Sequence, residues 1–309
     1  MLNNIEPSVL IILPVHNEAK YIERALDSVL KQSFTNWKVY CQDNASEDQT
    51  FEIVSRYSNR DSRIKIQRIS EKLNAAESFL SAANWALQSE SSQFVTWFSG
   101  DDFWVGEDFL GTLLDVLRSS VNIQKTITVP EFLLQSEEKP SNFSVLKIEL
   151  NDKKINKRLR KFIKSWLNVC VMYGLYHRAE FEKLVYSEES RFSAYLGSDW
   201  WWSYFAVKDC EIISTDVRFR KTHHEEGWRH DASTIKVSDN FLQKTLIFLE
   251  TRVKFLWKHF ILEKKRYRLL QDFWVTLFAL SYFFATISDL SKTAYLFLSK
   301  SRRMKNKSA

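Results

Sequence analysis

The first apolar run of the chain reads Val9-Leu10-Ile11-Ile12-Leu13 and is stopped by Pro14. A short, partly β-branched run of this kind is typical of a buried strand in a parallel sheet. A polar loop follows, and apolar residues then recur at helical spacing between residues 21 and 30 before a second strand-like run at residues 37–41. Strand, helix and strand in this order predict a βαβ unit and therefore the α/β class.

The same alternation continues along the chain. Residues 46–49 carry a capping signature that predicts the start of a second helix, and residues 64–69 alternate as a third strand. Residues 77–88 predict a third helix, and the apolar strand 94–98 runs directly into Ser99-Gly100-Asp101-Asp102. Ligands bind at the carboxyl edge of open α/β sheets, where loops leave the sheet and helix N-termini point into the crevice. We therefore expect these aspartates to lie at a ligand site.

The pattern changes beyond residue 130. Residues 153–167 predict an amphipathic helix with a basic face formed by Lys157, Arg158, Arg160, Lys161 and Lys164. From about residue 240, spaced apolar and aromatic residues predict two or three further helices and a basic end. The predicted organisation is a first half, residues 1–130, a second half, residues 131–239, and a C-terminal helical extension, residues 240–309.

The net charge of +6 is unevenly distributed over the 309 residues. From Arg252 to the end there are 13 Lys and Arg against 3 Asp and Glu, so this segment carries +10 and the remainder −4. Such a tail is suited to nucleic acid, to anionic lipid headgroups or simply to water, and charge alone does not separate them. Its longest uncharged run, Phe273 to Ser288, is shorter than the roughly 20 residues of a membrane-spanning helix.

Glycine and cysteine usage excludes several classes of protein. The chain has 6 glycines and neither the GxGxxG nor the GxxxxGK pattern, which excludes phosphate loops of those types. The number of cysteines is odd, and CxxC spacing is absent; they are Cys41, Cys170 and Cys210. The N-terminus lacks the basic and apolar regions of a leader peptide. These features predict a reducing, cytoplasmic setting.

Four segments, in this order and spacing, resemble the inverting GT-A fold glycosyltransferases of family 2 over the first two-thirds of the chain. They are Leu13 to Glu18, Asp43 to Thr50, Gly100-Asp101-Asp102, and Gly197-Ser198-Asp199. The resemblance implies a GT-A fold, with a Rossmann-like, mostly parallel sheet flanked by helices. It also implies a nucleotide-sugar donor, a divalent metal ion and transfer of one sugar to an acceptor hydroxyl.

The resemblance assigns the metal to the aspartate pair. Asp101 matches a ligand of Mg²⁺ or Mn²⁺ and Asp102 its helper, while Ser99 stands where the family usually has another Asp. Physical chemistry supports this independently, because a hard cation held by oxygen ligands stabilises the charge that grows on a departing diphosphate. The alternative is that the pair caps a helix beginning near Phe103.

The resemblance also implies a nucleotide site. Asp43 matches the family aspartate that accepts a hydrogen bond from the N3–H of uracil or thymine, and such a donor requires an acceptor. Asn44 and Ala45 replace a frequent Asp and Gly. The full predicted nucleotide-sugar set is Pro14, Val15, His16, Asn17, Glu18, Asp43, Asn44, Lys72, Asn84 and Asp101. For some of these residues there is an alternative interpretation: for Asn17 and Glu18, that they fix a turn; for Lys72, that it is only solvated; and for Asn84, that it has a packing role. Asp48 is interpreted as a first-turn helix residue.

The predicted catalytic base is Asp199. It matches the family aspartate that opens a helix in the acceptor half, although Ser198 replaces the usual Glu, and an ordinary N-cap is the alternative. The tryptophans at 200–202 stack on sugar or fill the core. His223 or His224 is predicted to complete the metal shell, with a solvated loop as the alternative; a zinc site is disfavoured because no cysteines lie at ligand spacing.

These residues together predict a metal-dependent inverting glycosyltransferase of surface polysaccharide or lipid-linked glycan synthesis. Its expected partners are a nucleotide-sugar donor, a glycan or lipid-linked acceptor and, through its basic segments, an anionic membrane on the cytoplasmic side, with no nucleic acid. An inactive carbohydrate-binding or scaffold protein of the same fold is the alternative. A sugar-nucleotide nucleotidyltransferase is disfavoured because residues 13–18 contain no glycine.

Overall fold

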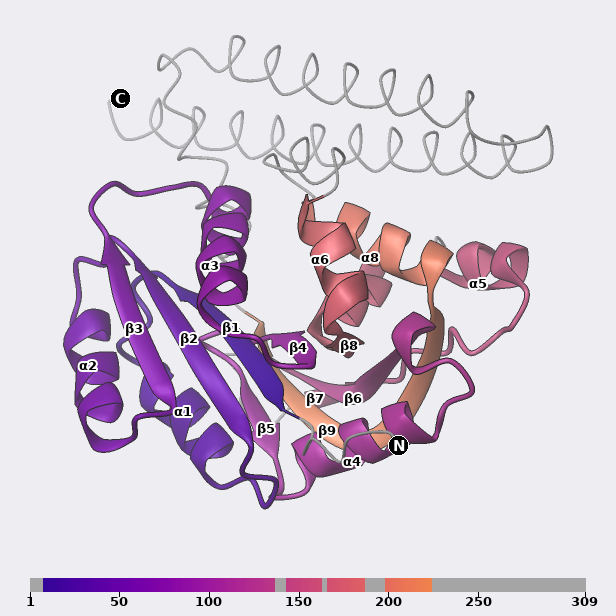
Figure 1. The fold of residues 1–309 in the computed structure, drawn as a ribbon, viewed down its shortest axis with the longest axis horizontal. Coiled ribbons are helices and arrows are strands. Elements are labelled where there is room, and N and C mark those ends of the chain that lie inside the picture. The colour runs from indigo at the N-terminus through magenta and orange to yellow at the C-terminus, as the bar shows by residue number, and fades with distance from the viewer. Residues whose placement is uncertain (1–7, 137–142, 163–165, 187–197, 224–309) are drawn as a thin grey trace, which may run out of the picture. The chain divides into compact units, whose positions relative to one another are not determined.

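The computed structural model describes residues 8–136, 143–162, 166–186 and 198–223. The chain divides into two units, Met1–Thr234 and Ile235–Ala309, and every described residue belongs to the first (Figure 1). The predicted C-terminal helices and basic tail therefore lie outside the described residues. Along the described ranges, no helix combines the length and the apolar character that crossing a membrane requires.

The first half of the sheet is parallel, as predicted. Its strands are β1 (Val9–Val15), β2 (Trp37–Asn44), β3 (Ile64–Ile69) and β4 (Phe94–Trp97), arranged in the order β3-β2-β1-β4. The strands are connected by helices α1 (Ile22–Leu30), α2 (Thr50–Arg60) and α3 (Ala75–Ser89). The register pairs Val15 with Asp43, so the carboxyl ends of β1 and β2 lie at one edge of the sheet.

The second half continues the same sheet in the order β8-β6-β9-β5. Its strands are β5 (Phe103–Val105), β6 (Thr126–Ser136), β7 (Phe143–Leu146), β8 (Leu175–His177) and β9 (Glu211–His223), with β7 paired to β6. Strand β8 is antiparallel to both β4 and β6, β9 is parallel to β6, and β5 is antiparallel to β9. The remaining elements are α4 (Phe109–Ser119), η1 (Ile123–Lys125), α5 (Ile155–Phe162), η2 (Trp166–Tyr173), α6 (Arg178–Tyr186) and α8 (Ser198–Asp209).

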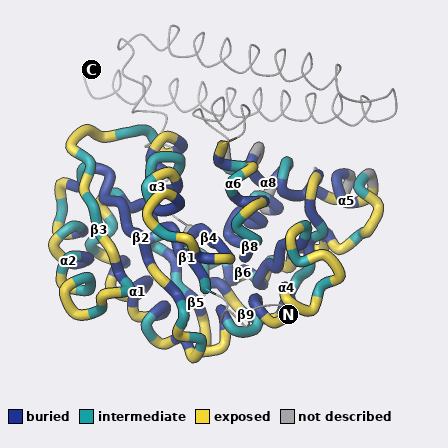
Figure 2. Tube along the Cα trace, viewed as in Figure 1, coloured by how far each residue is buried: buried dark blue, intermediate teal, exposed yellow. Residues whose placement is uncertain are grey.

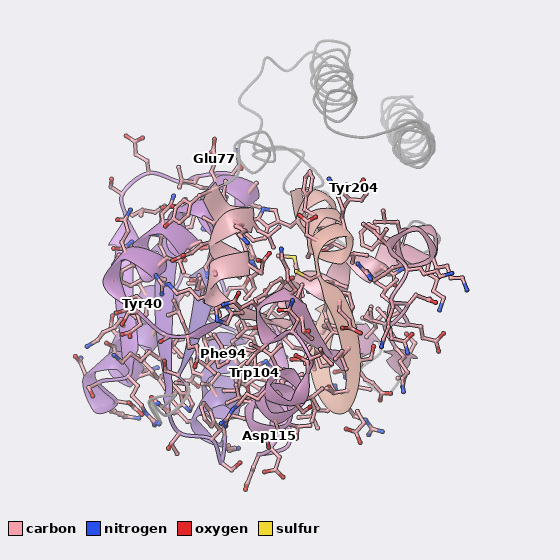
Figure 3. All side chains as sticks on the ribbon, turned by 45° about the vertical axis from the view of Figure 1, so that its right-hand side comes forward. Tyr40, Glu77, Phe94, Trp104, Asp115 and Tyr204 are labelled. Atoms are coloured by element: carbon pink, nitrogen blue, oxygen red, sulfur yellow. The ribbon has the colours of Figure 1, made fainter. Side chains whose placement is uncertain are left out.

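The core lies on both sides of the central strands, and Figure 2 shows these strands buried beneath helices whose outer surfaces are exposed. All seven residues of β1 are buried, as a two-sided apolar strand requires. An aromatic cluster joins β4 to the second half of the sheet: the Trp97 ring centroid lies 5.1 Å from that of Phe181 and 5.5 Å from that of Trp202. Figure 3 shows Phe94 and Trp104 in the interior, while Glu77 and Asp115 point outward from α3 and α4.

Two helix starts were considered near the loops, and the structure contains only the one at residue 50. No helix begins at Phe103; residues 103–105 form β5, so the aspartate pair precedes a strand and does not cap a helix. Helix α2 begins at Thr50, as the capping signature predicts, and Asp48 Oδ1 accepts the Thr50 N–H at 2.9 Å. The side chains of Ser46 and Asp48 also accept N–H groups of the loop after β1, as described below.

The second half also departs from the prediction. Strand β6 has 11 residues and runs past residue 130, where the sequence pattern changes, and its partner β9 lies far along the chain. The register shifts between Val129 and Glu131, where Pro130 has no N–H to give to a sheet.

Arg158 was expected on the solvated face of a basic helix, but it is buried. Its Nε donates to the Val207 carbonyl at 2.7 Å, and Nη2 donates to the Lys208 carbonyl at 3.4 Å. Carbonyls at the end of α8 have no partners within their own helix, and a buried cation satisfies them.

Candidate active site

Two loops are joined side by side at the carboxyl edge of the sheet. One follows β1 and the other follows β2, and backbone N–H groups of each loop donate to side-chain oxygens of the other. The bonds are Asn17 N to Ser46 Oγ (3.0 Å), Glu18 N to Thr50 Oγ1 (2.7 Å), Ala19 N to Asp48 Oδ2 (3.0 Å) and Glu47 N to Asn17 Oδ1 (2.8 Å). Asn17, Glu18 and Asp48 therefore fix loop geometry, which is the alternative that the sequence left open for the first two.

The joined loops require two left-handed backbone positions. Asn17 has φ 57° and Ala45 has φ 52°. Asn adopts this region more readily than most L-residues, whereas Ala gains nothing there. The family's frequent glycine at position 45 thus corresponds to a real backbone requirement, which Ala45 meets with strain.

Asp43 is the second-last residue of β2 and is completely buried. Its Oδ2 lies 3.2 Å from Arg68 Nε and accepts the backbone N–H of Ser46 at 3.2 Å. Its Oδ1 is buried and has no hydrogen-bond partner within the part of the chain that the structure describes. A buried carboxylate oxygen left without a donor is costly, so this atom is prepared for an N–H that a ligand brings.

Asn44 and His16 shape the rest of this pocket. The Asn44 amide donates to the Leu73 carbonyl at 2.9 Å and accepts the Leu73 N–H at 2.8 Å, which ties the loop before α3 to β2. The Nδ1–H of His16 donates to the Asn44 carbonyl at 2.9 Å. Burial and the charge of exposed Lys72 lower the pKa of His16, so Lys72 lies within electrostatic reach of the pocket.

Asn84 does not pack. It is exposed on α3, so the packing interpretation is wrong, and no described contact joins it to the pocket. Pro14 and Val15 are buried within β1 and support the loop through the backbone.

The turn after β4 carries Asp101 next to the joined loops. A Cβ on Gly100 would lie 3.0 Å from Val15 Cγ1 and 3.1 Å from Glu18 Cγ, so the turn packs directly on the loop after β1. Ser99 Oγ donates to Asp101 Oδ1 at 2.6 Å and orients the carboxylate. Ser99, which replaces a family aspartate, therefore acts as a donor to the carboxylate that remains.

Asp102 faces away from that carboxylate and is bound by β9. It is completely buried; its Oδ1 accepts the Thr222 N–H at 2.8 Å and its Oδ2 lies 3.1 Å from Lys221 Nζ. Burial and the charge of Asp101 raise the pKa of Asp102 to about 7, and Lys221 opposes this rise. Burial acts to lower the pKa of Lys221, but Asp102 and the Tyr173 phenol, 3.2 Å away, raise it well above its usual value.

The residues present suit a metal ion that is shared with a substrate. Within the described ranges, no group of three or more His, Cys, Asp or Glu residues is arranged to hold a metal. Both oxygens of Asp102 face donors on β9, whereas the carboxylate of Asp101 is half-buried and its Oδ1 accepts the Ser99 hydroxyl, so Asp101 is the better candidate for an oxygen ligand. Mg²⁺ is commonly held by one or two carboxylates together with substrate phosphates and water, so this donor set fits such an ion.

Asp199 lies in the first turn of α8, half-buried. This helix is attached to η2, since Ser203 Oγ donates to the Val169 carbonyl at 2.7 Å. Burial raises the pKa of the neighbouring Cys170 thiol to about 12, and the charges of Asp102 and Asp199 both contribute to this rise. Asp199 and Asp102 therefore both act electrostatically on one buried thiol.

The other predictions around α8 and β9 have mixed outcomes. Trp202 is buried against Trp97 and Phe181 and fills the core. The backbone of His223 ends β9, whereas its side chain, those of Trp200 and Trp201, and all of His224 lie outside what the structure describes.

Sequence reasoning did not predict which carboxylates the nearby basic residues contact. Lys221 is paired to Asp102, and Arg24 Nη2 donates to the Asp101 carbonyl at 3.2 Å. Arg68 is paired to Asp43. In the sequence, Arg68 and Lys221 are charged residues within strands next to apolar ones, but nothing local names their partners.

Comparison with known proteins gives consistent results. The sequence pattern described as "Glycosyl transferase family 2" matches residues 10–183. The "Putative teichuronic acid biosynthesis glycosyltransferase TuaG" of Bacillus subtilis (strain 168) is 34% identical over 103 residues, 33% of this chain and 39% of that protein. The "UDP-Glc:alpha-D-GlcNAc-diphosphoundecaprenol beta-1,3-glucosyltransferase WfgD" of Escherichia coli is 30% identical over 115 residues, 37% of this chain and 43% of its own length. The match thus spans less than half of either relative.

A solved structure shares the fold. The structure of S. aureus TarS 1–349 in complex with UDP-GlcNAc superposes with a TM-score of 0.52 at 18% identity, covering 81% of this chain and 65% of that one. The complex with UDP gives a TM-score of 0.50, covering 79% and 70%. This likeness confirms the GT-A fold that the motifs implied.

Proposed function

The chain belongs to glycosyl transferase family 2, and from that premise we propose that it transfers a sugar from a nucleoside diphosphate sugar to an acceptor hydroxyl. The observation that carries the proposal is the buried, partnerless Oδ1 of Asp43 at the sheet edge that also holds Asp101. The TarS structure is a complex with UDP-GlcNAc, and the name of WfgD includes UDP-Glc. Both support a sugar-nucleotide donor.

The proposed base of the donor is uracil or thymine. The N3–H of either ring would donate to Asp43 Oδ1, which needs one donor. Cytosine presents an acceptor at the same ring position, which would leave two acceptors facing each other. Arg68 holds the carboxylate by its other oxygen, so Oδ1 is oriented before the ligand arrives.

Asp101 is the proposed metal ligand, with His223 or His224 as further candidates. A bound Mg²⁺ or Mn²⁺ ion supplies positive charge against the departing diphosphate. Ser99 orients the Asp101 carboxylate, and Lys221 holds Asp102 in the interior. Asp102 is then a positioning residue for the turn, which revises its expected role as a second ligand.

Asp199 is the proposed general base. It takes the proton of the acceptor hydroxyl as that oxygen forms a bond to the anomeric carbon, while the bond from this carbon to the diphosphate oxygen breaks and its electron pair leaves with the nucleotide. Attack from the face opposite the leaving group inverts the anomeric configuration. The position of Asp199 in the first turn of α8, where it is half-buried, supports this role.

The proposed acceptor is a glycan or lipid-linked glycan of a surface polysaccharide at the cytoplasmic face of a membrane. The names of TuaG and WfgD, which concern teichuronic acid and a diphosphoundecaprenol-linked sugar, support this class. Exposed lysines before and on α5, Lys153, Lys154 and Lys157, supply positive charge suited to an anionic surface.

The test measures hydrolysis and transfer from UDP-sugars with Mn²⁺. We expect Asp199→Asn to lower turnover by about 10²–10⁴-fold with UDP affinity kept, because only proton removal is lost. In Asp101→Asn, turnover should respond less to added Mn²⁺. Asp115→Asn, at an exposed residue of α4, is the matched control and should change neither the turnover nor its response to Mn²⁺. If Asp199→Asn keeps full turnover, Asp199 is not the general base. If the chain binds UDP but turns over no donor, the result supports the inactive scaffold.

A further inference from the structure

Two arginines from different elements share one aromatic ring beside the Asp101 turn. The guanidinium carbon of Arg24, on α1, lies 4.3 Å from the ring centroid of Phe103, on β5. The guanidinium carbon of Arg220, on β9, lies 5.5 Å from the same centroid, and Arg220 pairs with Phe103 in the sheet register. Two positive groups are thus held near one ring at the rim of the candidate active site.

The charge of this pair is not neutralised. Among the described residues, no carboxylate lies within salt-bridge distance of Arg24 or Arg220, whereas neighbouring Lys221 is paired to Asp102. Arg24 Nη2 donates to two neutral oxygens, the Asp101 carbonyl at 3.2 Å and Thr222 Oγ1 at 3.4 Å. The Nε of Arg220 is buried and has no hydrogen-bond partner among the described residues.

The two guanidinium groups also act on each other. Their guanidinium carbons lie 4.3 Å and 5.5 Å from the same ring centroid, so the two positive charges repel each other. Two like charges held close together raise the free energy of the folded chain. A buried N–H that donates no hydrogen bond raises it further. An anion received by both groups would relieve both costs.

A phosphate group fits these donors best. Guanidinium N–H groups form paired, charge-assisted hydrogen bonds with the oxygens of phosphate, and a ring beneath them limits their motion. We propose that Arg24 and Arg220 form a phosphate-binding site, and that it receives a phosphate carried by the acceptor. The assignment to the acceptor rests on the proposed function.

This site differs from that of the donor diphosphate. The donor is assigned to the carboxylate of Asp101, whereas Arg24 approaches the main-chain carbonyl of the same residue together with Thr222. Phosphate at the arginine pair should therefore bind while a nucleotide occupies the pocket of Asp43.

The experiment titrates inorganic phosphate into the full chain, without metal and with saturating UDP, and follows binding by phosphorus NMR line broadening. We expect Arg24→Gln and Arg220→Gln each to weaken binding at least about tenfold, the loss typical of a charge-assisted hydrogen bond. Arg218→Gln is the matched control, because Arg218 lies on the same strand two residues earlier and faces Glu131 at 4.0 Å. Its phosphate affinity should stay unchanged, and UDP affinity of each variant reports folding.

Three results would overturn the inference: no phosphate binding by the unaltered chain, an equal loss in Arg218→Gln, or displacement of phosphate by UDP. A second arm uses phosphatidylcholine vesicles containing phosphatidic acid. Arginine-dependent binding to these vesicles assigns the phosphate to a lipid, and arginine-dependent binding of free phosphate alone assigns it to a water-soluble acceptor. Failure of the proposed function appears separately, as absence of UDP binding and of donor turnover.

Discussion

Ala45 is a single residue whose backbone conformation conflicts with its side chain. Its φ of 52° lies in the left-handed region, which costs an L-residue roughly 1–2 kcal/mol. Ala45→Gly removes that strain, but glycine raises the conformational entropy of the unfolded chain, which destabilises the folded state by about 0.4–1 kcal/mol. We therefore expect a net gain of up to about 1 kcal/mol in the free energy of unfolding. Urea denaturation measures it.

Ala82→Gly is the control for this prediction, because Ala82 is buried within helix α3. There glycine should destabilise the chain by about 1 kcal/mol. A destabilisation of the same size at position 45 would show that the left-handed conformation is not strained.

Residues also differ in how far their roles could be predicted. Asp43 and Asp101 were predicted at the ends of buried strands and lie at that edge. Asp102 is the neighbour of Asp101 in sequence, yet its carboxylate binds β9. Adjacent residues of a turn point in different directions, and the sequence pattern carries no information about which one meets a distant strand.

At the scale of elements, the entry into β8 depends on a backbone contact that only glycine permits. A Cβ on Gly174 would lie 2.7 Å from Ile127 Cγ2 and 2.8 Å from the Thr128 carbonyl oxygen. Because a backbone atom cannot move aside cheaply, we expect Gly174→Ala to destabilise the chain by about 1–3 kcal/mol in urea denaturation.

Gly111 offers the matched comparison. It lies inside α4, and the nearest atom to an added Cβ is Phe34 Cβ at 4.0 Å. Gly111→Ala should therefore stabilise the chain by about 0.5–1 kcal/mol, the ordinary helix preference for alanine. Similar effects at both glycines would contradict the contact with β6.

Helix α6 is preceded by a histidine that accepts a hydrogen bond. The Ala179 N–H donates to His177 Nδ1 at 3.2 Å, and burial lowers the pKa of His177 below 6.5, with Glu180 opposing and Lys183 adding to the effect. The unfolded chain therefore binds the proton more readily, so the free energy of unfolding should fall as pH decreases below about 6.5.

The variant His177→Asn keeps an acceptor at the helix start but does not titrate. The decline of stability between pH 7 and pH 5, measured by denaturation at each pH, should become shallower, while the contribution of His16, whose pKa is also lowered, remains. An unchanged slope would mean that His177 is not protonated differently in the two states.

At the scale of the whole molecule, the proposed nucleotide pocket joins loops that follow β1, β2 and β3. Ligand binding there should stabilise the folded unit, and UDP at one hundred times its Kd should add about 2.7 kcal/mol to the free energy of unfolding. Asp43→Asn should reduce this gain and lower the preference for UDP over CDP, because an amide can present a donor to cytosine.

Thermal denaturation with each nucleotide measures this gain. The control is Asp115→Asn, which is exposed on α4 and should keep the full stabilisation by UDP. If Asp43→Asn keeps the same preference for UDP, the base does not contact Asp43.

The sequence alone determined the parallel half of the fold. The order of β1, α1, β2, α2, β3, α3 and β4 was predicted because each element shows its own period, and consecutive strands of a βαβ unit pair with near neighbours. The carboxyl edge follows from that order, so the positions of Asp43 and Asp101 on it were predictable as well.

Only the tertiary structure decided what surrounds Asp101. Lys221 and Asp102 are 119 residues apart, Arg24 and Thr222 are 198 apart, and the strands that bring them together, β5, β6 and β9, pair across intervening elements. Charge and hydrophobic period are local properties of a chain, whereas a partner for a buried charge is selected by the packing of segments distant in sequence.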